Sequence, residues 1–157
     1  MELEQLLQKL HQAFLLVPFP RERITSHYCD ECDGIATFLR GRDREFLSRD
    51  DLNVFGDGRM NLITSNAIQY YFPQIIEKAL SPGESDLLKD VLYYLDFYSS
   101  RSGSNVALCS GSEIALFTED QQQAMLDFLS FVKDNHYSDI IEYMLEDELD
   151  KAIQTWA

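Results

Sequence analysis

The 157-residue chain is poor in positive charge. Its 13 Lys and Arg residues stand against 27 Asp and Glu residues, which gives a formal net charge of −14. Phosphate-rich partners and anionic lipid surfaces repel such a chain, so the composition argues against binding to nucleic acid or to a membrane. An acidic surface keeps a globular protein in solution, and it also suits a basic protein partner.

Long apolar runs are also missing, since no stretch approaches the roughly 18 residues that a membrane-spanning helix needs. The opening MELEQLLQKLHQAF has acids where a secretory signal carries basic residues. Cysteine is scarce, and the odd count of three does not suggest a disulfide framework in a chain long enough to bury its own core. We therefore predict a cytoplasmic protein in which clustered thiols serve metal or redox chemistry.

What the sequence has in quantity is apolar residues at helical spacing. Hydrophobic residues make up 45% of the chain, and no repeat or linker divides it, which predicts a single domain over residues 1–157. The predicted fold is mainly α, a bundle of about five to seven helices, with a short β-hairpin as an option near 105–117. Asp30 is expected to cap one helix, Pro73 to bend or divide another, and the last helix to run from near Ser138 to the end.

The segment TSHYCDECDG, residues 25–34, carries the clearest chemical signal. It places His27, Cys29 and Cys32 within six positions. Zinc is held by thiolate sulfur and imidazole nitrogen in a tetrahedron, and a Cys-x-x-Cys turn lets two sulfurs converge on one ion. His27 lies two residues before Cys29, so in an extended segment both side chains face the same way. We predict a metal site, most readily zinc, with His27, Cys29 and Cys32 as ligands.

The fourth ligand is left open by the sequence. The candidates are water and the side chains of Cys109, His136, His11, Glu31 and Asp33. A thiol redox pair, Cys29 and Cys32, is an alternative reading of the motif. The neighbouring acids Asp30, Glu31 and Asp33 disfavour a thiolate, however, whereas a bound dication welcomes them, so they favour metal binding over thiol exchange.

Several landmarks resemble those of an uncharacterised family of small bacterial proteins, a domain of unknown function. They span about residues 13–130, and the most specific is the H-x-C-x-E-C motif of His27, Cys29, Glu31 and Cys32. The resemblance implies that these four residues belong to the family's characteristic motif, and it implies no particular reaction. The other landmarks are Ala13-Phe14, Val17-Pro18, Pro20, Ile24-Thr25, Tyr71-Phe72-Pro73, Leu116-Phe117-Thr118, Gln121, Ala124 and Phe128-Leu129.

The function predicted from these observations is non-enzymatic. A zinc clip at His27, Cys29 and Cys32 would fasten the first loop to the second helix, and the acidic helical surface would bind a basic protein partner. A toxin-neutralising (immunity) role follows by analogy of size and charge alone. The alternatives are a hydrolase-type metalloenzyme with an open zinc position and Glu31 as base, and a thiol redox protein.

Overall fold

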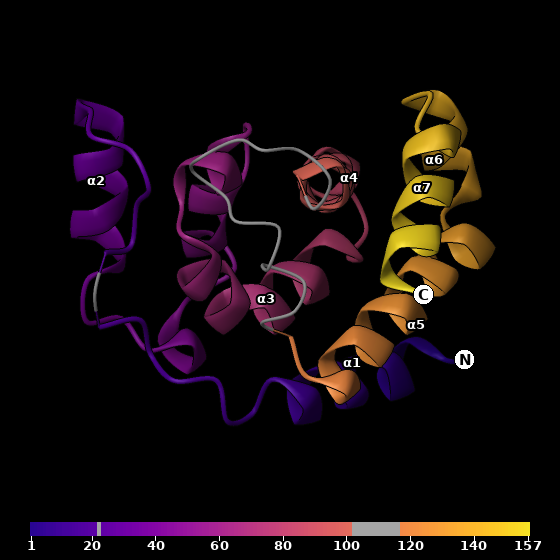
Figure 1. Ribbon diagram of the computed structural model, residues 1–157, viewed down its shortest axis with the longest axis horizontal. Coiled ribbons are helices and arrows are strands. Elements are labelled where there is room, and N and C mark those ends of the chain that lie inside the picture. The colour runs from indigo at the N-terminus through magenta and orange to yellow at the C-terminus, as the bar shows by residue number, and fades with distance from the viewer. Residues whose placement is uncertain (22, 102–116) are drawn as a thin grey trace. The chain divides into compact units, whose positions relative to one another are not determined.

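The computed structural model describes residues 1–21, 23–101 and 117–157, with the side chains of 96–101 left aside. The regular elements of these residues are helices, apart from one isolated β-bridge (Figure 1). The mainly α prediction is thus confirmed for the described chain. The hairpin considered near 105–117 lies almost wholly outside the described residues. The helices are α1 (Leu3–Ala13), α2 (Asp30–Leu39), α3 (Ser65–Ala79), α4 (Ser85–Arg101), α5 (Glu119–Asn135), α6 (Tyr137–Glu142) and α7 (Glu146–Trp156), with 3-10 turns η1 (Arg44–Phe46), η2 (Asp51–Phe55) and η3 (Arg59–Leu62).

The chain divides into two compact units, and the boundary falls within α4. Unit 1 consists of residues Met1–Leu15 and Val91–Ala157, and unit 2 of residues Leu16–Asp90. Whether the two units form the single domain predicted from the sequence stays a prediction. None of the described helices is both long enough and apolar enough to cross a bilayer.

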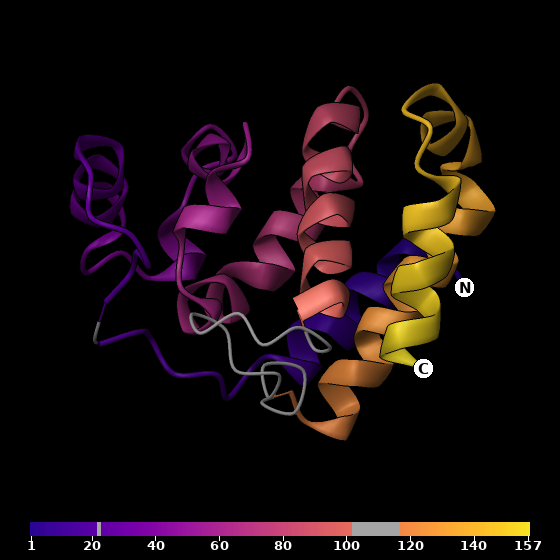
Figure 2. The same ribbon diagram turned by 45° about the horizontal axis from the view of Figure 1, so that its top comes forward.

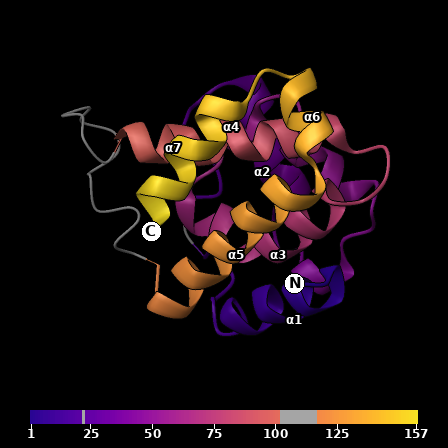
Figure 3. The same cartoon turned by 90° about the vertical axis from the view of Figure 1, so that its right-hand side faces the viewer.

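Unit 1 is built on α5, which packs against α1 and α7 (Figures 2 and 3). A capping box begins α5 at Thr118, because the Thr118 hydroxyl accepts the Gln121 N–H and the Gln121 side chain accepts the Thr118 N–H. The same Gln121 side chain donates to the Ala13 carbonyl at the end of α1. Phe117 contacts both Phe14 and Trp156 edge to face, so one ring joins the ends of three helices.

The single last helix expected from Ser138 onward is wrong, because the chain breaks it into α6 and α7. Met144 adopts a left-handed backbone with φ of 54°. The Leu145 N–H donates to the Ile140 carbonyl and the Met144 N–H to the Ile141 carbonyl, which is the Schellman pattern of a helix end. Ile140 is consequently buried, whereas Ile141 and Met144 are exposed.

Unit 2 has α3 at its centre, in contact with η1 and η2. Pro73 lies inside this helix, so the expectation of two abutting helices is wrong. Proline costs about 3 kcal/mol in a helix interior. The segment from Tyr70 to Ile76 is buried throughout, and burial of these large side chains offsets that cost.

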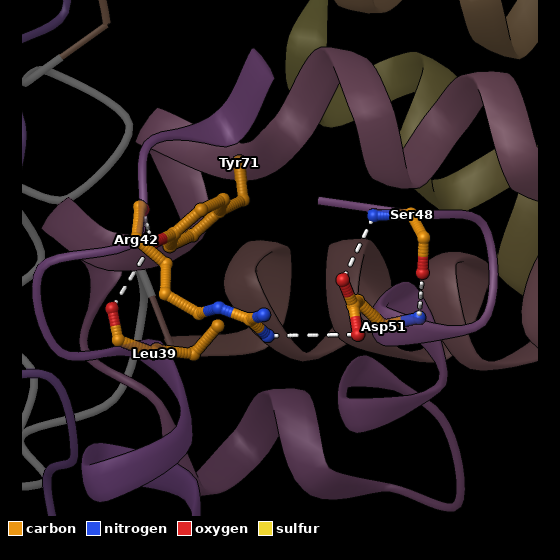
Figure 4. Close-up of polar contacts among 5 residues, drawn as sticks. All are labelled: Leu39, Arg42, Ser48, Asp51 and Tyr71. Carbon is orange, nitrogen blue, oxygen red and sulfur yellow. Dashed lines mark hydrogen bonds and ion pairs between the residues drawn. The ribbon is translucent and has the colours of Figure 1, made fainter. Parts of the chain in front are cut away.

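The end of α2 is fastened to α3 and η2 by a small polar network (Figure 4). The buried Tyr71 hydroxyl donates to the Arg42 carbonyl at 2.6 Å and lies 3.5 Å from the Leu39 carbonyl. The Arg42 guanidinium lies 3.5 Å from the Asp51 carboxylate. Asp51 and Ser48 exchange two bonds, each side chain accepting the backbone N–H of the other residue. This network holds the connection between α2 and η2 against α3.

Candidate metal centre

The segment that leads into the Cys-x-x-Cys turn is held by backbone hydrogen bonds to the start of α3. Thr25 and Ile63 form an isolated antiparallel bridge. The Thr64 N–H donates to the Ile24 carbonyl at 2.8 Å, and the Ser26 N–H donates to the Leu62 carbonyl at the same distance. These bonds fix the backbone up to the residue before His27, so the loop expected there from the sequence has a defined path.

Cys29 is the N-cap of α2, where Asp30 was expected. The Cys29 backbone is extended, with φ of −159° and ψ of 171°, and its sulfur accepts the Cys32 N–H at 3.3 Å. Asp30 is instead the first helical residue and places its charge in the positive first turn, together with Glu31 and Asp33. Because Cys29 caps α2, Cys32 follows one turn later, and this brings both sulfurs to the same end of the helix.

The three residues predicted as ligands come together. The ligand atoms of His27, Cys29 and Cys32 all lie within 4.8 Å of one another, and this group could hold a metal ion. The His27 Nδ1 atom lies 3.8 Å from the Cys32 sulfur. His27 is exposed, Cys29 is half-buried and Cys32 is fully buried. The group therefore reaches from the core of unit 2 to its surface, and its open side faces solvent.

The pKa values of the two thiols are shifted in opposite directions. The Cys32 backbone N–H, then its thiol and the His27 ring, stabilise the Cys29 thiolate, and together they lower the pKa of Cys29. Burial, with the nearby Cys29 and the acids Glu31 and Asp33, raises the pKa of Cys32 to about 11. The expectation that the neighbouring acids disfavour a thiolate thus holds for Cys32 and is wrong for Cys29, where the hydrogen bonds are the larger effect.

The nearby carboxylates do not complete the group. The Glu31 carboxylate faces the Arg59 guanidinium at 3.4 Å, and His27, Cys29 and Cys32 are the three members of the group that the described residues form. Arg59 also donates to the Asn53 and Gly56 carbonyls, so it ties the start of α2 to the η2–η3 turns.

The more distant candidates for a fourth ligand belong to other parts of the chain. His11 and His136 lie in unit 1, and the His136 ring contacts the Asp139 carboxylate at 3.3 Å. Cys109 lies outside the described residues. The fourth position of a tetrahedral ion therefore remains assigned to no described side chain.

Arg59 is a residue of the site that sequence reasoning missed. It lies 28 positions after Glu31 in the sequence, and an arginine after an Asp-Gly turn can serve many roles, so no local pattern indicates this contact. Only the fold brings the two side chains together.

Comparisons with protein-family models, with curated proteins and with solved structures found no match to this chain. The resemblance to an uncharacterised bacterial family therefore stays a prediction.

Proposed function

We propose that this protein is a non-enzymatic zinc-binding protein, in which His27, Cys29 and Cys32 hold the ion and an acidic helical surface binds a basic protein partner. The observation that supports the metal site is the convergence of three ligand atoms, of the types that zinc prefers, within 4.8 Å. A tetrahedral zinc ion separates two sulfurs by about 3.8 Å and sulfur from nitrogen by about 3.6 Å. The 3.8 Å between His27 and Cys32 is close to that requirement.

The positions of the ligands also favour a clip. His27 follows the segment bonded to the start of α3, whereas Cys29 and Cys32 belong to the first turn of α2. An ion bound to all three would join these two elements of unit 2. The lowered pKa of Cys29 supports ion binding as well, because the thiolate is the form that binds metal.

The charge distribution supports a partner for unit 1. Unit 1 has four Lys and Arg against fourteen Asp and Glu, a formal charge of −10 out of the −14 of the whole chain. Glu142, Glu146 and Asp147 are exposed around the α6–α7 junction. If this surface binds a basic protein, changing the three residues to their amides should weaken the complex with that protein. Crosslinking of the complex across a salt series measures the effect. Equal complex formation by the triple variant would refute the assignment of this surface.

The contact between Glu31 and Arg59 argues against the hydrolase alternative. A general base must reach the water that it activates. The Glu31 carboxylate instead faces a guanidinium at 3.4 Å, which suits a role in positioning α2. We accordingly assign no catalytic residue.

A thiol redox role is the second candidate, and the geometry of the two cysteines favours it. Cys29 is at a helix N-terminus, where its sulfur accepts a backbone N–H, and Cys32 lies buried behind it with the two sulfurs within 4.8 Å. A half-buried nucleophilic thiol beside a buried second thiol is the arrangement that dithiol exchange requires. The two functions compete for the same sulfurs, so one protein preparation can distinguish them.

Metal content is the deciding measurement. Protein purified under reducing conditions is loaded with zinc, freed of excess by dialysis and analysed for metal per chain. We expect one zinc per chain in the wild type, and strong loss of zinc in His27→Gln and in Cys29→Ser. His136→Gln is the matched control, because it removes a histidine of unit 1 that contacts Asp139 and should leave the zinc content unchanged.

Other results would change the assignment. Equal zinc in the wild type and in Cys29→Ser would refute the proposed ligand set. Absence of zinc, combined with a Cys29–Cys32 disulfide that forms and is reduced readily in a glutathione buffer, would assign the redox function instead.

A further inference from the structure

Unit 2 contains a surface hollow beside the candidate metal centre. It has a volume of about 480 Å³ and lies between residues 19–21 and 23–25 and one face of α2. Asp33 and Ala36 of α2 and its C-cap Arg40 line it and recur at helical spacing. A second hollow of about 340 Å³ shares Phe19, Pro20, Arg21 and Arg23 with the first. The volume falls in the range of small-molecule sites, about 300–1,000 Å³.

The arginines of this hollow differ from the others in the described part of the chain. Arg42, Arg44, Arg49 and Arg59 each lie within 4 Å of an Asp or Glu carboxylate. The three remaining arginines whose side chains are described are Arg21, Arg23 and Arg40. All three line the hollow, and none forms an ion pair with a carboxylate of the described residues.

One of these arginines is also held in place. The Arg23 guanidinium lies 3.9 Å from the centre of the Tyr28 ring, a cation–π contact that orients it at the edge of the hollow. Phe19 and Tyr28 supply aromatic walls beside the guanidinium groups. With one acid, Asp33, against three arginines, the described residues that line the hollow carry a formal charge of +2, in a chain whose net charge is −14.

We propose that this hollow binds a small phosphate ester with an aromatic or other flat apolar group. A phosphate monoester carries a charge of about −1.5 to −2 at pH 7, which is opposite in sign to the charge of the described lining residues. Guanidinium groups donate paired hydrogen bonds to phosphate oxygens, and aromatic walls pack against a flat organic group. The site is distinct from the metal ligands and does not depend on zinc.

Titration calorimetry with phenyl phosphate tests the proposal, in low salt and with a chelator present so that no metal contributes. We expect saturable binding of one molecule per chain, and at least about tenfold weaker binding for Arg21→Gln and for Arg40→Gln, since bonds to a charged ligand are lost. Arg49→Gln is the matched control, because it removes the same charge from an exposed arginine of unit 2 that lies outside the hollow and should bind as the wild type does. Cys29→Ser should also bind normally, which separates this site from the metal centre.

Four results would overturn the proposal. They are the absence of saturable binding, equal weakening by Arg49→Gln, binding that requires zinc, and binding of a glutamate-rich peptide in place of phenyl phosphate. The last result would assign the arginines to an acidic protein partner.

Discussion

Replacing Cys29 by serine should separate its observed role as a helix cap from its proposed role as a metal ligand. The Cys29 sulfur accepts the Cys32 N–H at the start of α2, and serine is among the best residues at an N-cap. Without metal, we expect Cys29→Ser to unfold within about 0.5 kcal/mol of the wild type, whereas Cys29→Ala, which leaves the N–H without a partner, should cost about 1 kcal/mol.

With zinc, Cys29→Ser should become clearly less stable than the wild type, because serine is a poor zinc ligand. Free zinc at 1,000 times its dissociation constant stabilises the wild type by about 4.1 kcal/mol. If loss of the thiolate weakens binding about 100-fold, the same zinc concentration stabilises Cys29→Ser by only about 1.4 kcal/mol. The difference of about 2.7 kcal/mol moves the urea midpoint by about 1 M, for a slope of about 2–3 kcal/mol per M.

The assay is urea unfolding of the wild type, Cys29→Ser and Cys29→Ala, each with a chelator and with buffered zinc. If Cys29→Ser without metal is as unstable as Cys29→Ala, Cys29 acts through packing and not as a helix cap. If zinc stabilises Cys29→Ser as much as the wild type, the Cys29 sulfur is not a ligand.

Three further predictions concern the fold. Tyr71→Phe should lower the free energy of unfolding by about 1–2 kcal/mol, since the Arg42 carbonyl loses a part-buried 2.6 Å hydrogen bond. Met144→Gly should raise it by about 0.5–1 kcal/mol, because φ of 54° strains methionine and the exposed side chain contributes little packing. Asp51→Asn should reduce the acid sensitivity of the protein. The Ser48 N–H, more than any other group, holds the pKa of Asp51 below its usual value. The stability from Asp51 is therefore present above its unfolded pKa, near 4, and is lost as the pH falls through the lowered folded value.

Urea unfolding measures all three effects, the last between pH 2 and 6. Phe72→Leu, a change of size without loss of a hydrogen bond, is the control for Tyr71→Phe. Met144→Ala controls for the methionine side chain, since it keeps a Cβ at the strained position and should gain no stability. Equal stability of Tyr71→Phe and the wild type, destabilisation by Met144→Gly, or parallel acid curves for Asp51→Asn and the wild type would each contradict the corresponding argument.

The parts of the structure that the sequence predicted depend on local spacing. His27, Cys29 and Cys32 lie within six residues, so an extended segment followed by one helical turn brings their ligand atoms together. The capping box at Thr118 is another pattern that the residue types specify over a few positions.

The parts that were missed depend on contacts between distant residues or on unusual residues at common positions. The bridge between Thr25 and Ile63 and the contact between Glu31 and Arg59 form only after folding. The end of α6 carries methionine where glycine usually signals a left-handed turn, so no residue type indicated the break between α6 and α7. The buried apolar position consequently differs by one residue from that of a continuous helix.

The Thr25–Ile63 bridge has a consequence for how an ion would enter and leave. The backbone on one side of His27 is fixed by this bridge, and on the other side Cys29 caps α2. An ion bound by this group would meet a segment whose main chain is already ordered, so little conformational entropy would be lost on binding. Its uptake and release would then require no refolding of this segment.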